Sequence, residues 1–140
     1  MEKERQSKIL ELNMLDAQLK QLEQQAMMIE QQIFDQQSLI TNLDELKKSK
    51  KGQEMLFQLS RNVFAEGNLK NSNEVLVNVG SNVIVKKNIE EAKKITERAK
   101  LKLVDLNEDI RKEMQNIIFT IVRLEKDLQC NDPNCTHENH

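Results

Sequence analysis

A narrow seam of apolar residues between residues 12 and 43 limits the folds that this chain can adopt. Its members alternate at intervals of three and four residues, and Gln, Glu, Lys and Asn side chains flank them. This heptad spacing is typical of a helix that pairs with another helix, rather than one that covers a broad core. Of the ten seam positions only Gln36 is polar, and the set is Leu12, Leu15, Leu19, Leu22, Ala26, Ile29, Ile33, Gln36, Ile40 and Leu43.

A second seam predicts a second helix after Asn88, which is a residue type that caps helix N-termini. Glu90 and Glu91 would lie in its first turn, where acidic side chains are favoured. The seam advances by about 3.6 residues per step, with eleven-residue intervals before Met114, so we expect this part of the helix to run nearly straight. Its members are Ala92, Ile95, Ala99, Leu103, Leu106, Ile110, Met114, Ile117, Ile121, Leu124 and Leu128.

Residues that break helices lie outside both seams. The three glycines fall between residues 52 and 80, and the single proline is Pro133. Four lysines between residues 47 and 51 favour a helix C-terminus there, with Gly52 just beyond it. An antiparallel pair of such helices would place Leu12 opposite Leu128 and Leu43 opposite Ile95.

The segment between the helices contains a repeat with a period of twenty residues. Residues 55–69 align with residues 75–89, and four aligned pairs are identical: Leu56 with Leu76, Asn62 with Asn82, Val63 with Val83, and Asn68 with Asn88. Each copy has the pattern of a strand, a tight polar turn and a second strand, which predicts a β-hairpin.

Two isolated hairpins bury too little apolar surface to be stable in water. A pair of helices offers only a narrow end for them to pack on, so we expect the strands to join a sheet or barrel shared between subunits. The side chains predicted to form this contact are Leu56, Phe57, Leu59, Val63, Phe64, Val75, Val77, Val79, Val83 and Val85.

The predicted fold is α+β and mainly α. It is a long antiparallel coiled-coil hairpin with two β-hairpins at its base, which assemble into an oligomeric β-barrel. We expect one domain over residues 1–140. It consists of a helix over 1–51, the hairpins over 52–88, a helix over 89–130 and a tail over 131–140. Aromatic residues make up only 3% of the chain, which is too few to fill a wide core.

The order of helix, two hairpins and helix resembles the alpha-type subunits of the prefoldin family. The likeness is most specific over residues 74–92, Glu-Val-Leu-Val-Asn-Val-Gly-Ser-Asn-Val-Ile-Val-Lys-Lys-Asn-Ile-Glu-Glu-Ala, which are similar to the family's second hairpin and the start of its second helix. The first hairpin departs from the pattern, because Ser60-Arg61 replaces a Gly-Ser-like turn and Gly67 is expected to interrupt the second strand.

This resemblance implies an ATP-independent holdase chaperone in the cytoplasm. It implies a hexamer of two alpha-type and four beta-type subunits, whose coiled-coil tips hold unfolded client proteins and deliver them to a group II chaperonin. Self-assembly into a filament is known among alpha-like relatives of the family.

Apolar residues outside the seams mark a candidate client-binding surface near both chain ends. Flexible apolar side chains suit weak, sequence-tolerant capture of unfolded chains. The alternative is that they only thicken the contact between the helices. The set is Ile9, Leu10, Met14, Ile118, Phe119 and Val122.

The C-terminal residues contain all the cysteines and histidines of the chain: Cys130, Cys135, His137 and His140. Two thiolates and two imidazoles can form a tetrahedral zinc site. The spacing differs from that of a familiar zinc finger, and a polar tail without bound metal is the alternative. The resemblance to prefoldin requires no cofactor.

Other functional classes find little support in the sequence. The longest apolar run, residues 117–122, is far shorter than the ~18–20 residues that cross a bilayer. The net charge of −2 gives no basic region suited to nucleic acid. No set of nucleophile, base and acid is evident, so we expect no enzymatic activity. The alternative functions are a coiled-coil scaffold or adaptor without chaperone activity, and a tether linked through metal at the tail.

Overall fold

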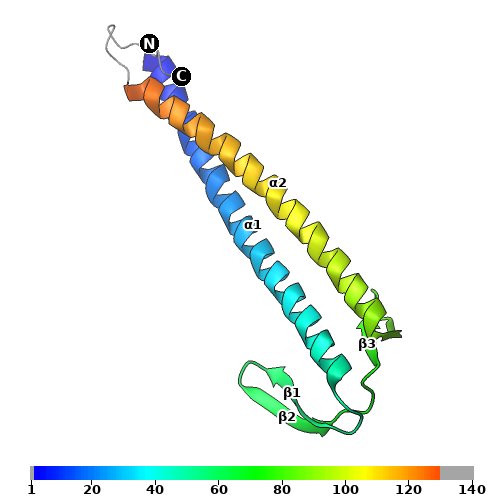
Figure 1. The fold of residues 1–140 in the computed structure, drawn as a ribbon. Helices are drawn as coiled ribbons and strands as arrows, with labels where there is room; N and C mark the ends of the chain where they lie inside the picture. The colour runs from blue at the N-terminus through cyan, green and yellow to red at the C-terminus, as the bar shows by residue number, and fades with distance from the viewer. Residues whose placement is uncertain (1, 130–140) are drawn as a thin grey trace. The chain divides into compact units, whose positions relative to one another are not determined.

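The computed structural model describes residues 2–129 and consists of two long helices with four short strands between them (Figure 1). The mainly helical fold with two β-hairpins is the one that the sequence predicts. In chain order the elements are α1 (Glu2–Lys48), β1 (Glu54–Ser60), β2 (Val63–Asn68), β3 (Glu74–Asn78), β4 (Ile84–Asn88) and α2 (Ile89–Gln129). Neither helix is long and apolar enough to cross a membrane within the described residues.

The chain divides into two compact units. The terminal unit combines residues 2–31 of α1 with residues 104–129 of α2. The central unit comprises residues 32–103 and therefore holds both hairpins together with the adjoining ends of the two helices.

Helix α1 ends at Lys48, three residues before the predicted end. The Ser49 amide donates to the Leu46 carbonyl in the last turn. Gly52 was expected to follow the helix directly, but it instead opens the first hairpin. It has a φ of +85°, and its amide donates to the Leu69 carbonyl at 2.7 Å.

Helix α2 begins with the cap predicted at Asn88. The Asn88 Oδ1 accepts a hydrogen bond from the Glu91 amide at 2.8 Å, and the Asn88 Nδ2 donates to the Glu91 Oε1 at 3.1 Å. This reciprocal pair satisfies one of the free amides of the first turn and fixes the point where β4 becomes helix.

The core of the central unit lies where the first turn of α2 meets the last turns of α1. Leu43, Ile89 and Ala92 are buried together, and Leu46, Val75 and Val77 pack against them. Alternate residues of a strand face opposite sides, so Val75 and Val77 turn the same face of β3 toward the helices. The second hairpin is thereby held by its own chain.

Each hairpin is a separate two-stranded antiparallel sheet. In the second, β3 and β4 pair without irregularity from Glu74 with Asn88 to Asn78 with Ile84. Gly80, Ser81 and Asn82 form its turn with positive φ values. The first hairpin is less regular, because its register shifts between Gln58 and Ser60.

Gly67 does not interrupt the first hairpin, contrary to the expectation from sequence. It lies within β2 and pairs with Met55 on β1. The Phe57 ring covers it so closely that a Cβ at this position would lie 2.6 Å from the ring. The absence of a side chain therefore makes room for Phe57 on this face of the sheet.

The seam of α1 is as predicted, since all ten of its positions are buried or half-buried. The seam of α2 differs at two positions. Ile95 and Leu106 are exposed, and the polar neighbours Thr96 and Asn107 are buried in their place. Thr96 belongs to a column at strict seven-residue spacing, and its hydroxyl donates to the Ala92 carbonyl at 2.8 Å, so this polar group is satisfied inside the seam. The column is Ile89, Thr96, Leu103, Ile110, Ile117 and Leu124.

Polar contacts in the central unit show that its helix segments run antiparallel. Glu90 binds Lys47, Lys93 binds Asp44 at 2.9 Å, and Lys100 donates to Gln37 at 2.5 Å. As the position on α2 advances, the partner on α1 moves back along the chain. In the terminal unit, Arg111 binds Glu30 at 3.1 Å.

In two of these ion pairs, the partner shifts the pKa of one member. The hydrogen bond and the charge of Lys47 lower the pKa of the Glu90 carboxyl. The hydrogen bond and the charge of Asp44 raise the pKa of the Lys93 ammonium. All four groups lie at the surface, so salt screens these interactions.

Ile89→Ala tests the core of the central unit. Ile89 is only 2% exposed, and removing a buried Ile side chain to Ala lowers the free energy of unfolding by ~2–5 kcal/mol. Leu101→Ala is the control, since Leu101 is 62% exposed and should change this free energy by less than ~0.5 kcal/mol. Urea unfolding followed by circular dichroism measures both, and equal losses would contradict this core.

Glu90→Gln tests the ion pair with Lys47. Because the pKa of Glu90 is lowered in the fold, its carboxylate stabilises the fold above the usual carboxyl pKa. That contribution is lost as the pH falls through the lowered value. We expect the variant to melt slightly below the wild type at pH 7 in low salt. The difference should disappear once the pH has fallen below the lowered pKa of Glu90, or in ~1 M salt. Glu108→Gln is the control for a solvated carboxylate, and a difference independent of pH would refute the interpretation.

Candidate functional site

The hairpins expose large apolar side chains on a surface that the chain itself leaves open. We call this set the hairpin surface, and Leu76 in β3, which is 68% exposed, is typical of it. It comprises Leu56, Phe57, Leu59, Val63, Phe64, Leu76, Val79, Val83 and Ile84. Each sheet has only two strands, so every strand also has an unpaired edge.

The strand residues singled out from sequence divide into two groups. Leu56, Phe57, Leu59, Val63, Phe64, Val79 and Val83 belong to the hairpin surface. Val75, Val77 and Val85 are half-buried, and the first two pack against the core of their own unit.

Leu76 and Ile84 belong to the hairpin surface but were not predicted. The signal for Leu76 was present, because it alternates with Val75 and Val77 and must face the other side of β3. Ile84 is the register partner of Asn78 and lies beside the turn.

A groove of about 830 Å³ extends the hairpin surface within the central unit. The residues that line it include Leu39 of α1, Ile95 of α2, Leu56 of β1 and Leu76 of β3. All four are exposed. The outward position of Ile95, which was expected in the seam, therefore adds apolar surface to this groove.

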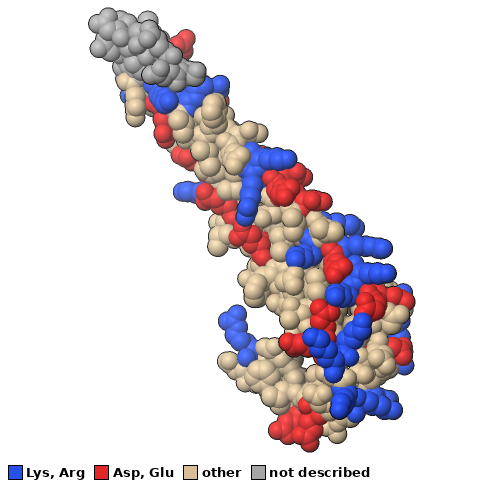
Figure 2. Space-filling model, viewed as in Figure 1, with Lys and Arg blue, Asp and Glu red and all other residues tan. Residues whose placement is uncertain are grey.

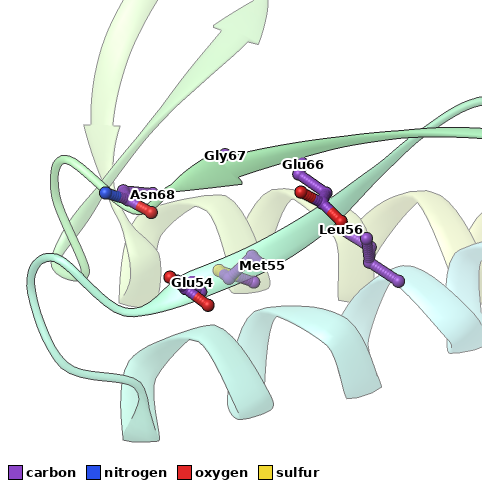
Figure 3. Close-up of a pocket in the computed structure, with 6 residues that line it drawn as sticks. All are labelled: Glu54, Met55, Leu56, Glu66, Gly67 and Asn68. Atoms are coloured by element: carbon purple, nitrogen blue, oxygen red, sulfur yellow. The ribbon is translucent and has the colours of Figure 1, made fainter.

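A smaller pocket of about 440 Å³ lies along the first hairpin. Figure 3 shows Glu66 of β2 beside Leu56 of β1, and these two residues are register partners. The other lining residues are Glu54, Met55, Gly67 and Asn68. Glu54 and Glu66 are the only ionisable side chains among these lining residues.

The terminal unit carries a second set of exposed apolar side chains, which we call the terminal apolar surface. Phe119 is the most open member, at 74% exposed. The set is Ile9, Leu10, Met14, Ile118, Phe119 and Val122, the residues singled out from sequence, and all six are exposed. Met27 and Met28 of the same unit are also exposed and lie outside the set.

Charged side chains of both signs are interspersed over the visible face of the molecule, without a large patch of one sign (Figure 2). Interspersed charges of both signs are typical of a solvent-exposed surface. On this face, no patch of one charge sign marks a recognition site.

The candidate zinc ligands Cys130, Cys135, His137 and His140 lie outside the described residues, and zinc binding there stays a prediction. Among residues 2–129, no group of three or more His, Cys, Asp or Glu side chains is arranged to hold a metal ion.

Comparison with known proteins agrees with this geometry. The family model described as "Prefoldin subunit" matches residues 15–131. A structure of filamentous PFD from Methanocaldococcus jannaschii superposes with a TM-score of 0.71 at 21% identity, over 82% of this chain and 95% of that chain. It shows that the two share a fold.

Curated relatives named "Prefoldin subunit alpha" are similar over most of the chain. The protein from Methanobrevibacter smithii is 30% identical over 107 residues, which cover 76% of this chain and 73% of the relative. The protein from Archaeoglobus fulgidus is 27% identical over 127 residues, which cover 91% and 93% of the two chains. By its order of elements, its fold and its sequence, this chain belongs to the prefoldin family.

Proposed function

We propose that this chain is an alpha-type prefoldin subunit acting as an ATP-independent holdase in the cytoplasm. It would hold unfolded proteins on its terminal apolar surface and pass them to a group II chaperonin. Prefoldin is a family of chaperone subunits and is not known for enzymes, which supports the general role. The names of the curated relatives support the alpha type.

The observation that carries the proposal is the presence of two sets of exposed apolar side chains, the hairpin surface and the terminal apolar surface. Fully burying one Leu side chain is worth ~1.5–3 kcal/mol, so the nine members of the hairpin surface form a strong potential interface. Its occupants are other prefoldin subunits, which complete the open strand edges and cover the groove. We infer an assembly with beta-type subunits, two alpha with four beta, through a shared β-barrel.

The terminal apolar surface suits clients rather than fixed partners. Ile9, Met14 and Phe119 belong to long helices and expose flexible or flat apolar groups. Such contacts are individually weak and tolerate many sequences. A holdase needs this combination, because it must bind unrelated unfolded chains and release them without ATP.

The alternative proposal is a scaffold or adaptor that uses the same hairpin surface for assembly but binds no clients. The exposure of all six residues of the terminal apolar surface favours the holdase. Neither function requires the candidate zinc site of the C-terminal residues, whose occupation by zinc would be a separate property.

Leu56→Ser with Leu76→Ser tests the hairpin surface as the assembly interface. Removing two Leu side chains from an apolar contact should raise the dissociation constant of the assembly at least ~tenfold. Size-exclusion chromatography with light scattering, with and without a beta-type subunit, measures the change. The matched control replaces their register partners, Glu66→Ser with Lys86→Ser, and should leave assembly intact. Unchanged assembly of the Leu variant would contradict the proposed interface.

Ile118→Ser, Phe119→Ser and Val122→Ser together test client capture. The triple variant, assembled with a beta-type subunit, should suppress aggregation of a thermally unfolded test protein several-fold less than the wild type does. Light scattering without ATP measures suppression, and the assembly itself should keep its mass.

The matched control removes three exposed apolar side chains elsewhere, with Met27→Ser, Met28→Ser and Leu101→Ser, and should retain suppression. Full suppression by the Ile118, Phe119 and Val122 variant would refute capture at these residues. No suppression by a wild-type assembly of verified mass would favour the scaffold.

A further inference from the structure

The spacing of the buried seam residues of α2 changes at Asn107. The column from Ile89 to Leu124 keeps strict seven-residue spacing throughout. Between successive members of the column, the seam contains one further residue, which we call the companion. Before Leu103 each companion lies three residues after a column member, as Ala92 and Ala99 do, and both are buried or half-buried. After Leu103 the companions follow four residues later, as Asn107, Met114, Ile121 and Leu128. The seam therefore contains two successive intervals of four, which locally unwinds a coiled coil.

The residue choice at this change is unfavourable for tight packing. Asn107 is only 7% exposed, and its Oδ1 is buried without a hydrogen-bond partner. The adjacent Leu106 would have continued the earlier companions, yet it is exposed. Burying an unsatisfied amide oxygen while an apolar neighbour faces solvent weakens the helix pair at this point.

The shift in the seam and the unsatisfied buried oxygen are both specific to this part of α2. The seam of α1 keeps its alternating intervals from Leu12 to Leu43 without a shift. Thr96 is also buried, but its hydroxyl is satisfied by the Ala92 carbonyl. On α2, the terminal unit begins at Val104, so Asn107 lies in its first turn there.

We propose that Asn107 makes residues 104–110 a built-in site of local opening in the helix pair of the terminal unit. The buried amide gains hydration when the helices separate here, and this offsets part of the lost packing. The stretches of α2 with apolar companions, such as Met114 to Leu128, lack this compensation and stay closed. In a holdase that receives clients of different sizes, local opening would let the terminal unit adapt, a consequence that rests on the proposed function.

Amide hydrogen exchange of the full wild-type chain, in the assembly it forms, tests the opening without any assay of client binding. We expect the amides of residues 104–110 to exchange at least ten times faster than those of residues 92–99 and 114–121. An even profile across these three stretches would overturn the proposal. The proposed function could still hold in that case, and a failed holdase assay would not alter the exchange result.

Asn107→Leu provides the second test, because it is close to the native side chain in size and removes the unsatisfied oxygen. Exchange of residues 104–110 should slow at least tenfold, with a higher melting temperature. Thr96→Val, the matched control at a satisfied buried position, should leave exchange at 104–110 unchanged. The proposal is wrong if Asn107→Leu folds but leaves this exchange as fast as before, or if Thr96→Val slows it equally. If the Leu variant does not fold, the wild-type profile decides.

Discussion

Two helices that pair along a narrow seam can cover each other but little else, and the remaining structure depends on this limit. In the central unit, the end of the pair buries Leu43, Ile89 and Ala92 and accepts Val75 and Val77 from one strand. No comparable cover exists among the described residues for Leu56, Leu59, Leu76 and the other exposed hairpin side chains. A two-stranded sheet has no second layer of its own to bury them. Oligomerisation is the physical solution to this arrangement, and membership of the prefoldin family agrees with it.

The same limit separates the two kinds of apolar surface. The hairpin surface combines apolar side chains with open strand edges, which offer directional hydrogen bonds and a defined register to another subunit. The terminal apolar surface belongs to helices, whose backbone groups are already bonded, so it offers only side-chain contact. Strand edges favour a partner subunit of fixed geometry, whereas side-chain contact alone can accommodate many different sequences. The chain thus presents two apolar surfaces of different chemistry.

The sequence predicted those features that periodicity determines. All ten seam positions of α1 face inward because strict heptad spacing leaves one setting for the helix, and Asn88 caps α2 with the hydrogen bonds that its side chain permits. The expected seam of α2 was wrong at Ile95, because the seven-residue column passes through Thr96 instead. It was also wrong at Leu106, because from Leu103 onward the second seam residue follows the column by four positions, which selects Asn107. Gly67 was misjudged for a different reason, since the position of the Phe57 ring depends on cross-strand geometry. Leu76 was overlooked although strand alternation assigns it to the open face.

We expect other subunits to cover the apolar hairpins of this chain. Native mass spectrometry of the unmodified protein, alone and mixed with a beta-type prefoldin subunit at micromolar concentration, tests it most directly. We expect the mixture to form an assembly of defined mass, several times the 16.4 kDa of one chain, in which both subunits are present. A chain that stays folded and monomeric in both conditions would show that other subunits do not cover its hairpins.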